Sequence, residues 1–195
     1  MIGSFKCKLQ ELALDIFHYC LKYNIKLTPQ WIPRDLNQNA DTLSKVQDTD
    51  AWGIDEESFN YLSSLLGPYT VDRFADDRNA KLPCFNSKFY CSGTAHVNAF
   101  TADWSYHNNW CSPPVSLIGS TIKHMCRCKG MGTLLLPEWK SAYYWPIICP
   151  DGVHLATFIK KAIYVNPYYY SYTPNSVLTG YVSFRTLALA ISFND

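Results

Sequence analysis

Apolar residues recur at helical spacing in two stretches of the chain, and turn-forming residues mark where each stretch ends. In the first, apolar positions repeat every three or four residues over 9–21, which predicts an amphipathic helix that ends near Asn24. A second such helix is predicted from about Asp55, with an inner face of Phe59, Leu62, Leu65 and Leu66. Gly67 followed by Pro68 is typical of a helix end and predicts that this helix stops there.

Short apolar runs alternate with one helical stretch further along the chain. Residues 69–75 predict a short strand, and 76–100 predict a loop with one helical turn. Residues 109–112 and 132–137 predict buried strands on either side of a helix within 115–129. Because a strand, helix, strand order implies a parallel crossover, this part of the chain predicts an α/β sheet with helices on its faces.

Three further segments have weaker patterns. Residues 25–34 alternate at period two, with Ile25, Leu27 and Trp31 on one side, which predicts a strand that Pro29 interrupts. Residues 40–45 predict a short helix. The tail, 151–195, mixes β-prone runs with a tyrosine-rich loop.

Composition limits the classes of function. Lys plus Arg is 17 and Asp plus Glu is 16, so no basic excess favours tight unaided binding to nucleic acid. The eight cysteines lie in apolar contexts, and acidic residues interrupt the apolar N-terminal stretch, so neither a disulfide framework nor a signal peptide is predicted. No apolar run approaches the roughly 20 residues that cross a bilayer. We therefore expect an intracellular chain, cytoplasmic or nuclear, without a membrane partner.

Residues 9–45 contain a helix, then Trp31-Ile-Pro-Arg34, then Asn39-Ala-Asp41-Thr-Leu-Ser44. This order resembles the last part of the RNase H domain in retrotransposon polyproteins. The resemblance implies that Asp41 is the last metal-binding carboxylate of a site where two Mg²⁺ ions clamp the scissile phosphate. Because the family's other carboxylates precede this segment, we expect Asp41 to bind Mg²⁺ only if they are supplied in trans. The alternative is that Asp41 is a first-turn charge that suits a helix dipole.

Residues 68–150 carry a second resemblance. The sequences "GPYTVDRFADDRNAKLPCFNSKFY", "NAFTADWSYHNNWCSPPVSLIGSTI" and "GTLLLPEWKSAYYWPII" are similar to the Dam-like adenine-methyltransferase module of phages. They are also similar to the related region that follows RNase H in DIRS-type retrotransposons. Since the RNase H-like segment lies immediately upstream, the two resemblances together predict a fragment of a DIRS-type polyprotein.

The resemblance also locates a methyl-transfer motif. Enzymes that methylate exocyclic amines of bases have Asn or Asp, then Pro-Pro, then an aromatic residue at a strand end, whereas this chain has Ser112, Pro113, Pro114 and Val115. A planar carbonyl and a proline carbonyl accept the amine protons, and the aromatic ring stacks on the extruded base. Losing the first acceptor costs about 3–4 kcal/mol in the transition state, and losing the stack roughly 1–3 kcal/mol. We therefore expect a degenerate, inactive motif.

The same resemblance implies a place for S-adenosylmethionine. Strand 70–75 occupies the position of the first cofactor strand, so Asp72, Phe74 and Asp76 are candidates for cofactor contact, together with Asp103 before the motif strand. No G-x-G turn follows that strand. The alternatives are that Asp72 pairs with Arg73 or Arg78, and that Asp103-Trp104 is a turn with a packed indole.

Two other signals are weak. His124 to Cys128 ("HMCRC") lies in a predicted helix and lacks the second cysteine pair of a zinc site. Cys111 has no evident base, and Trp110 in its apolar strand is expected to be a core residue.

The sequence thus predicts an α/β chain with a truncated RNase H-like C-terminal piece and a methyltransferase-like, Rossmann-type, mostly parallel sheet. The predicted parts are an RNase H-like fragment (1–46), a linker with an amphipathic helix (47–67), a degenerate Dam-like region (68–150) and a β-rich extension (151–195). The predicted function is a retroelement-derived, non-catalytic module without its own cofactor. The alternatives are an active S-adenosylmethionine-dependent DNA adenine N-methyltransferase and an RNase H nuclease completed in trans. DNA, an RNA–DNA hybrid and the rest of the polyprotein are the expected partners.

Overall fold

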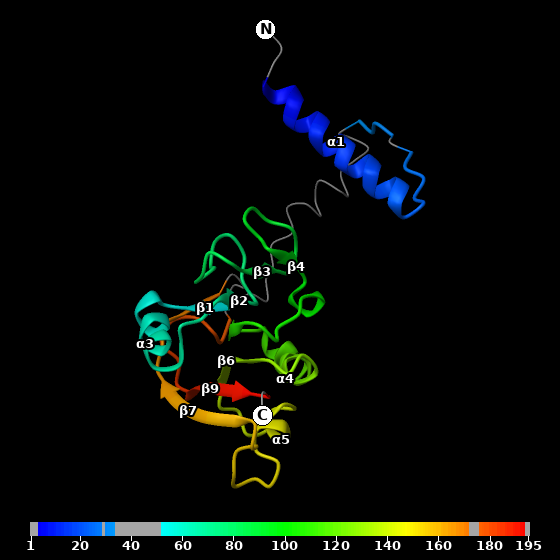
Figure 1. Cartoon of the computed structure of the whole chain (residues 1–195). Helices are drawn as coiled ribbons and strands as arrows, with labels where there is room; N and C mark the ends of the chain where they lie inside the picture. The colour runs from blue at the N-terminus through cyan, green and yellow to red at the C-terminus, as the bar shows by residue number, and fades with distance from the viewer. Residues whose placement is uncertain (1–3, 29, 34–51, 172–175, 194–195) are drawn as a thin grey trace. The chain divides into compact units, whose positions relative to one another are not determined.

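The computed structural model describes residues 4–28, 30–33, 52–171 and 176–193 of the 195-residue chain. The chain divides into two units, residues 1–46 and residues 47–195, which are considered separately (Figure 1). Asp41 and the helix predicted over 40–45 lie outside the described residues. None of the described helices is long and apolar enough to span a membrane.

The described part of the first unit contains one helix, α1 (Ser4–Lys22), as the apolar spacing predicts. The helix ends where Asn24 takes a left-handed conformation (φ 52°) and the Ile25 N–H donates to the Cys20 carbonyl at 2.8 Å. Asn is one of the few residues that adopt this conformation readily. The strand predicted over 25–34 is wrong, because residues 25–28 and 30–33 form no strand. A strand needs a neighbour to pair with, and the described part of this unit offers none.

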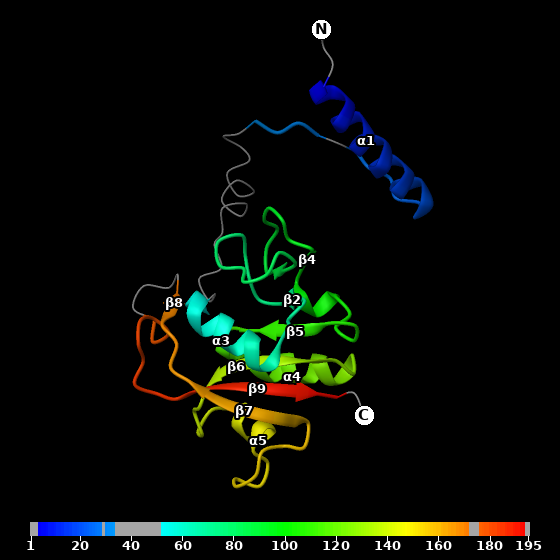
Figure 2. The ribbon, with the colours of Figure 1, turned by 60° about the vertical axis from the view of Figure 1, so that its left-hand side comes forward.

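The second unit is built on a five-stranded sheet in the order β2-β5-β6-β9-β7 (Figure 2). Strand β6 pairs in parallel with β5 and antiparallel with β9, and β9 pairs antiparallel with β7. The prediction of a mostly parallel sheet therefore needs correction, because the last strand returns between β6 and β7 and makes the sheet mixed. The strands are β2 (Val71–Asp72), β5 (Asn108–Cys111), β6 (Met131–Pro137), β7 (Ile159–Val165) and β9 (Thr186–Ser192).

The other edge of β2 is also paired. Phe85 forms a parallel bridge with Asp72, whose N–H donates to the Cys84 carbonyl at 3.0 Å. The chain continues into β3 (Asn86–Ser87), which pairs in parallel with β4 (His96–Val97). The parallel strands therefore extend from β2 in both directions: first to β3 and β4, then back across to β5 and β6.

Helices cover both faces of the sheet. Helix α3 (Glu56–Leu66) packs Phe59 and Leu62 against Trp110, Leu135 and Ala188. The opposite face is covered by α4 (Ile118–Arg127) and α5 (Trp145–Ile148). Alternation along β6 separates the two cores, since Leu134 and Leu136 face α4 and α5 while Leu135 faces α3. Leu62 is fully buried, which stabilises the fold by roughly 1.5–3 kcal/mol. The burial of Trp110 confirms it as a core residue.

A two-stranded ribbon lies beside the α3 face. It pairs β1 (Trp52–Ile54) antiparallel with β8 (Tyr169–Ser171). Trp52 and Tyr169 are buried in the same core as Phe59, with their ring centres 5.5 Å apart. This ribbon brings the segment before α3 close to the segment between β7 and β9.

Candidate active site

The strand order fixes where a ligand would bind. In open α/β sheets, ligands bind outside the carboxyl ends of parallel strands at the point where the chain changes direction across the sheet. Here that point lies between β2 and β5, because β2 is followed by β3 and β4 on one side and by β5 on the other. The Arg73 N–H donates to the Trp110 carbonyl at 3.0 Å, so the segments that follow β2 and β5 are neighbours. These segments contain Asp72–Asp76 and Ser112–Val115.

Asp72 is a buried carboxylate held by backbone groups. Its oxygens accept N–H groups of Lys81 at 3.0 Å and Phe74 at 3.4 Å. It pairs with neither of the arginines considered from the sequence. Burial raises its pKa from 3.8 to about 6, although the two N–H donors and the nearby Lys81 charge oppose the shift. Through these two hydrogen bonds Asp72 holds the loop after β2 against the end of that strand.

Arg73 is a buried cation bound by neutral acceptors. Its Nε donates to Asn109 Oδ1 at 2.7 Å, and one terminal nitrogen donates to Asn86 Oδ1 at 2.8 Å. Its guanidinium carbon lies 5.1 Å from the centre of the Trp104 ring. Burial lowers its pKa. Asn86, 1% exposed, has an amide nitrogen without a hydrogen-bond partner. This network joins β2, β5, β3 and the loop before β5.

The other candidates for cofactor contact each have a structural partner. The ring of Phe74 packs edge-on against Phe100 and Trp104 in the core under α4. Asp76 pairs with the Arg78 guanidinium and accepts the Arg78 N–H at 2.9 Å. Asp103 is exposed and accepts the Ser105 N–H at 2.9 Å, in a turn beside the fully buried Trp104. The alternative of a turn with a packed indole describes this segment.

The Ser112–Val115 motif directly follows β5 and is largely enclosed. Ser112 is 6% exposed, and Pro113 and Pro114 are buried as well. Val115 is half-buried and packs against both cores. Its carbonyl accepts the Tyr143 hydroxyl at 3.0 Å. The motif therefore presents neither a planar side-chain acceptor nor an aromatic ring.

The Pro113 carbonyl already has a donor. The indole N–H of Trp52, from β1, donates to this oxygen at 2.9 Å in a buried position. Trp52 is 1% exposed, so the bond is shielded from water. In the expected chemistry the target amine donates a hydrogen bond to a proline carbonyl, and here an internal indole N–H is the donor to that oxygen.

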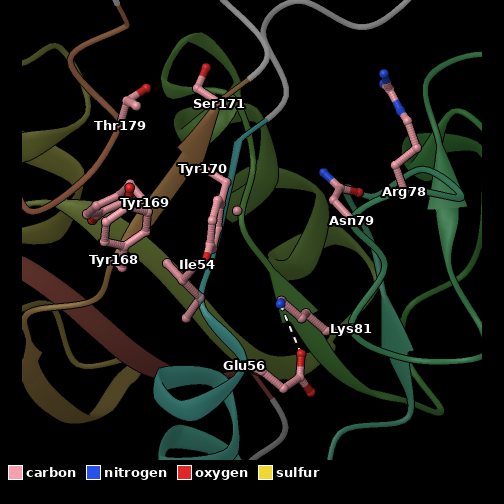
Figure 3. A pocket seen from close by; sticks show the side chains of 11 residues that line it. Ile54, Glu56, Arg78, Asn79, Lys81, Tyr168, Tyr169, Tyr170, Ser171 and Thr179 are labelled. Atoms are coloured by element: carbon pink, nitrogen blue, oxygen red, sulfur yellow. Dashed lines mark hydrogen bonds and ion pairs between the residues drawn. The ribbon is translucent and has the colours of Figure 1, made fainter.

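A pocket of about 500 Å³ lies between the loop after β2 and the β1–β8 ribbon (Figure 3). Figure 3 shows Tyr170 on one side and Asn79 and Arg78 on the other. Lys81 Nζ pairs with Glu56 at 3.0 Å across its lower end. Its volume lies in the range of small-molecule sites.

The residues at this strand end fit S-adenosylmethionine only in part. The pocket volume suits a nucleoside-sized ligand. A Rossmann-type site, however, uses a glycine-rich turn after its first strand and a carboxylate after the second, which binds ribose hydroxyls. Here β2 is followed by Arg73-Phe-Ala-Asp76, and β3 ends at Ser87 and is followed by Lys88. Asp72 and Asp76 are already engaged, so the polar groups that would hold the cofactor are few.

The weak metal and nucleophile signals are explained by packing. His124 lies in α4, where a ring nitrogen is 3.0 Å from the Ala102 carbonyl. No cluster of three metal-binding side chains occurs among the residues that the structure describes. Cys111 is fully buried, and burial raises the pKa of its thiol, which leaves it protonated and unreactive.

Two residues at this site escaped the sequence reasoning. Arg73 directly follows β2, within the segment 70–75 predicted as a strand, where a buried charge is unexpected; its position between Asp72 and Phe74 is the only sequence signal. Trp52 lies in a segment that its polar neighbours marked as a linker. An isolated tryptophan in such a segment could have suggested a buried anchor.

Comparison with known proteins identifies a family. A family model described as DNA N-6-adenine-methyltransferase (Dam) matches residues 41–163. A search of curated protein sequences finds no match to this chain. The family match covers more than half of the chain and includes β2, β5, β6 and the Ser112–Val115 motif. The chain therefore belongs to the Dam family of DNA N-6-adenine-methyltransferases.

Proposed function

We propose that this chain is a Dam-family domain that has kept the methyltransferase fold and lost methyl transfer. The observation that carries the proposal is the buried hydrogen bond between Trp52 and the Pro113 carbonyl, within a motif that has Ser112 and Val115 at its outer positions. In this arrangement an internal group already uses one of the two lone pairs of a carbonyl oxygen that a target adenine would need.

The expected loss of rate is large. Replacing a preorganised carbonyl acceptor costs about 3 kcal/mol in the transition state. Losing the stacking ring costs about 2 kcal/mol more. The sum, about 5 kcal/mol, corresponds to nearly four orders of magnitude in rate. The Trp52 bond adds to this, because it must break or be shared before a base can approach Pro113.

The upstream segment suggests the biological context. Residues 9–45 resemble the end of a retroelement RNase H domain, and we propose that the chain belongs to the polyprotein of a DIRS-type element. Its role there would be that of a non-catalytic module beside the reverse transcriptase and its template. Asp41 would contribute to a Mg²⁺ site only with carboxylates supplied from elsewhere.

An active adenine methyltransferase is the second candidate. It is supported by the family match and by the pocket of about 500 Å³ next to the loop after β2. If it is correct, S-adenosylmethionine binds in that pocket, and the Trp52 bond opens when DNA binds.

Calorimetric titration with S-adenosylmethionine, followed by methyl transfer to a DNA oligonucleotide, tests the proposal. The proteins are the full chain, a Ser112→Asn, Val115→Tyr double variant and a Ser116→Asn control at an exposed neighbouring position. We expect no transfer by the parent or the control. Transfer by the double variant alone would locate the loss in the motif. Transfer by the parent would contradict the proposal.

A further inference from the structure

A second pocket, of about 420 Å³, lies where the start of α3 meets the end of β7. Tyr168 borders both this pocket and the pocket of about 500 Å³. Among the described residues, its lining includes acidic and aromatic side chains and no Lys, Arg or His. Its charged and aromatic lining residues are Asp55, Glu57, Tyr61, Tyr164, Tyr168 and Tyr181.

Tyr168 and Tyr181 line the pocket, and their rings contact each other. The rings of Tyr168 and Tyr181 are perpendicular, with centres 5.3 Å apart. Both are exposed, Tyr181 by 74%. The face of an aromatic ring is electron-rich and attracts cations. Tyr164 already has such a partner, since the Arg185 guanidinium carbon lies 4.9 Å from its ring centre and Arg185 pairs with Glu138. We therefore consider Tyr168 and Tyr181 as the rings that would contact a bound cation.

Asp55 supplies a negative charge whose oxygens are already engaged. Oδ1 accepts the Ser58 N–H and Oδ2 accepts the Tyr168 N–H, each at 2.8 Å. Burial opposes ionisation, but these N–H donors outweigh it and lower the pKa of Asp55, so it is ionised at neutral pH. A ligand with several N–H donors would compete with these backbone groups, whereas a cation without N–H groups would feel only the charge.

From this combination we propose that the pocket binds a quaternary ammonium group. Aromatic walls and a nearby carboxylate are the features that recognise such cations. The pocket volume leaves room for the stem that carries the trimethylammonium head. Two sources share this chemistry, a small choline-like molecule and a trimethylated lysine side chain of a peptide. The proposal is independent of whether the chain transfers methyl groups.

Titration followed by nuclear magnetic resonance of the full chain tests the proposal, with choline as the probe. Its neutral isostere, 3,3-dimethyl-1-butanol, has the same shape without the charge. We expect saturable shifts at Tyr168 and Tyr181 with choline and about tenfold weaker binding of the isostere. Equal binding of the two, or no saturable shift with choline, would overturn the proposal.

Substitutions test the contributions of the carboxylate and of the aromatic ring to binding, separately from any effect on folding. Tyr181→Leu should weaken choline binding about tenfold, while Tyr181→Phe keeps the ring and should stay within about threefold. Asp55→Asn removes the charge and one of the two acceptor oxygens, and its remaining oxygen can cap α3, so it should weaken binding without loss of helix. Tyr106→Leu, at an 89% exposed position that does not line the pocket, is the control. Unchanged binding in both Tyr181→Leu and Asp55→Asn would contradict the proposed site.

A peptide with trimethyl-lysine, beside the same peptide with unmodified lysine, distinguishes the two sources. If the methylated peptide binds about tenfold tighter than choline while the unmodified peptide does not bind, that result identifies a protein partner. Equal affinity for choline and the methylated peptide identifies the head group alone as the ligand. Binding of the unmodified peptide as tightly as the methylated one would refute the preference for a quaternary ammonium.

Discussion

The buried carboxylate of Asp72 should make the stability of the domain fall as pH rises. Its pKa is about 6 in the folded chain and 3.8 in the unfolded reference, mainly because burial disfavours the charge. The folded state therefore binds the proton more tightly, and folding is favoured most below pH 3.8. The shift of about two units corresponds to roughly 3 kcal/mol, which is lost as the pH rises from about 4 to 6.

Asp72→Asn removes this titration while retaining one acceptor oxygen. Loss of the second acceptor, which now receives the Lys81 N–H, destabilises the variant by an amount that does not depend on pH. The unfolding free energies of parent and variant are therefore compared at each pH. The test is how the difference between them changes with pH. From the two pKa values, this difference should change by about 2 kcal/mol between pH 4.5 and pH 7.5, in the direction that disfavours the parent at higher pH.

Urea unfolding at steps of half a pH unit measures this difference. Asp77→Asn, at an exposed position in the same loop, is the matched control. The parent and the Asp72 variant should differ in their pH slope, whereas the parent and the control should give nearly parallel curves. Parallel curves for Asp72→Asn would refute the reasoning, since they would mean that this carboxylate ionises in the folded chain as it does in water.

Four further substitutions, one of them a control, test the fold of this unit. Arg73→Met leaves amide oxygens of Asn86 and Asn109 without their donor and should lower the unfolding free energy by about 2–4 kcal/mol in urea. Gly132→Ala places a Cβ only 2.2 Å from the Asn109 carbonyl oxygen in the neighbouring strand, so it should lower the unfolding free energy by about 2–3 kcal/mol or more. Gly53→Ala is the control, because the space around Gly53 is open, and it should leave the unfolding free energy nearly unchanged. Trp52→Phe removes the donor to the motif carbonyl and should destabilise by about 1–3 kcal/mol, and an unchanged melting temperature would contradict a buried bond.

The local elements around the site could be predicted because their signals are local. The helix that Gly67-Pro68 ends is α3, capped by Asp55, which accepts the Ser58 N–H. The strands predicted at 109–112 and 132–137 are β5 and β6, and the intervening helix is α4. Each depends on apolar spacing and a capping or turn residue within a few positions, which the sequence displays directly.

Long-range pairing could not be predicted. Strand β9 pairs with β6 and β7 along its whole length, and nothing in 186–192 indicates that it enters between them in the opposite direction. The strand predicted over 25–34 failed for a related reason, since alternation describes a possible strand but not the neighbour that it needs. The short strands β3 and β4, which complete the switch point, are too brief to give a periodic signal.

The candidate site shows the same limit. The sequence could identify Asp72, Asp76 and the Ser112–Val115 motif as chemically interesting groups. It could not show that backbone N–H groups bind Asp72, or that an indole from a distant segment bonds to the motif carbonyl. These partners come from residues up to 61 positions away and depend on the assembled sheet.

A single-turnover assay measures directly whether the chain transfers methyl groups to adenine. The full chain, in excess over a double-stranded oligonucleotide rich in adenine, is incubated with saturating S-adenosylmethionine, and N6-methyladenine is measured by mass spectrometry. We predict no N6-methyladenine above the level without protein, because the motif lacks the planar acceptor and the aromatic ring, and its Pro113 carbonyl accepts a hydrogen bond from Trp52. Stoichiometric methylation of adenine by the parent chain would contradict it.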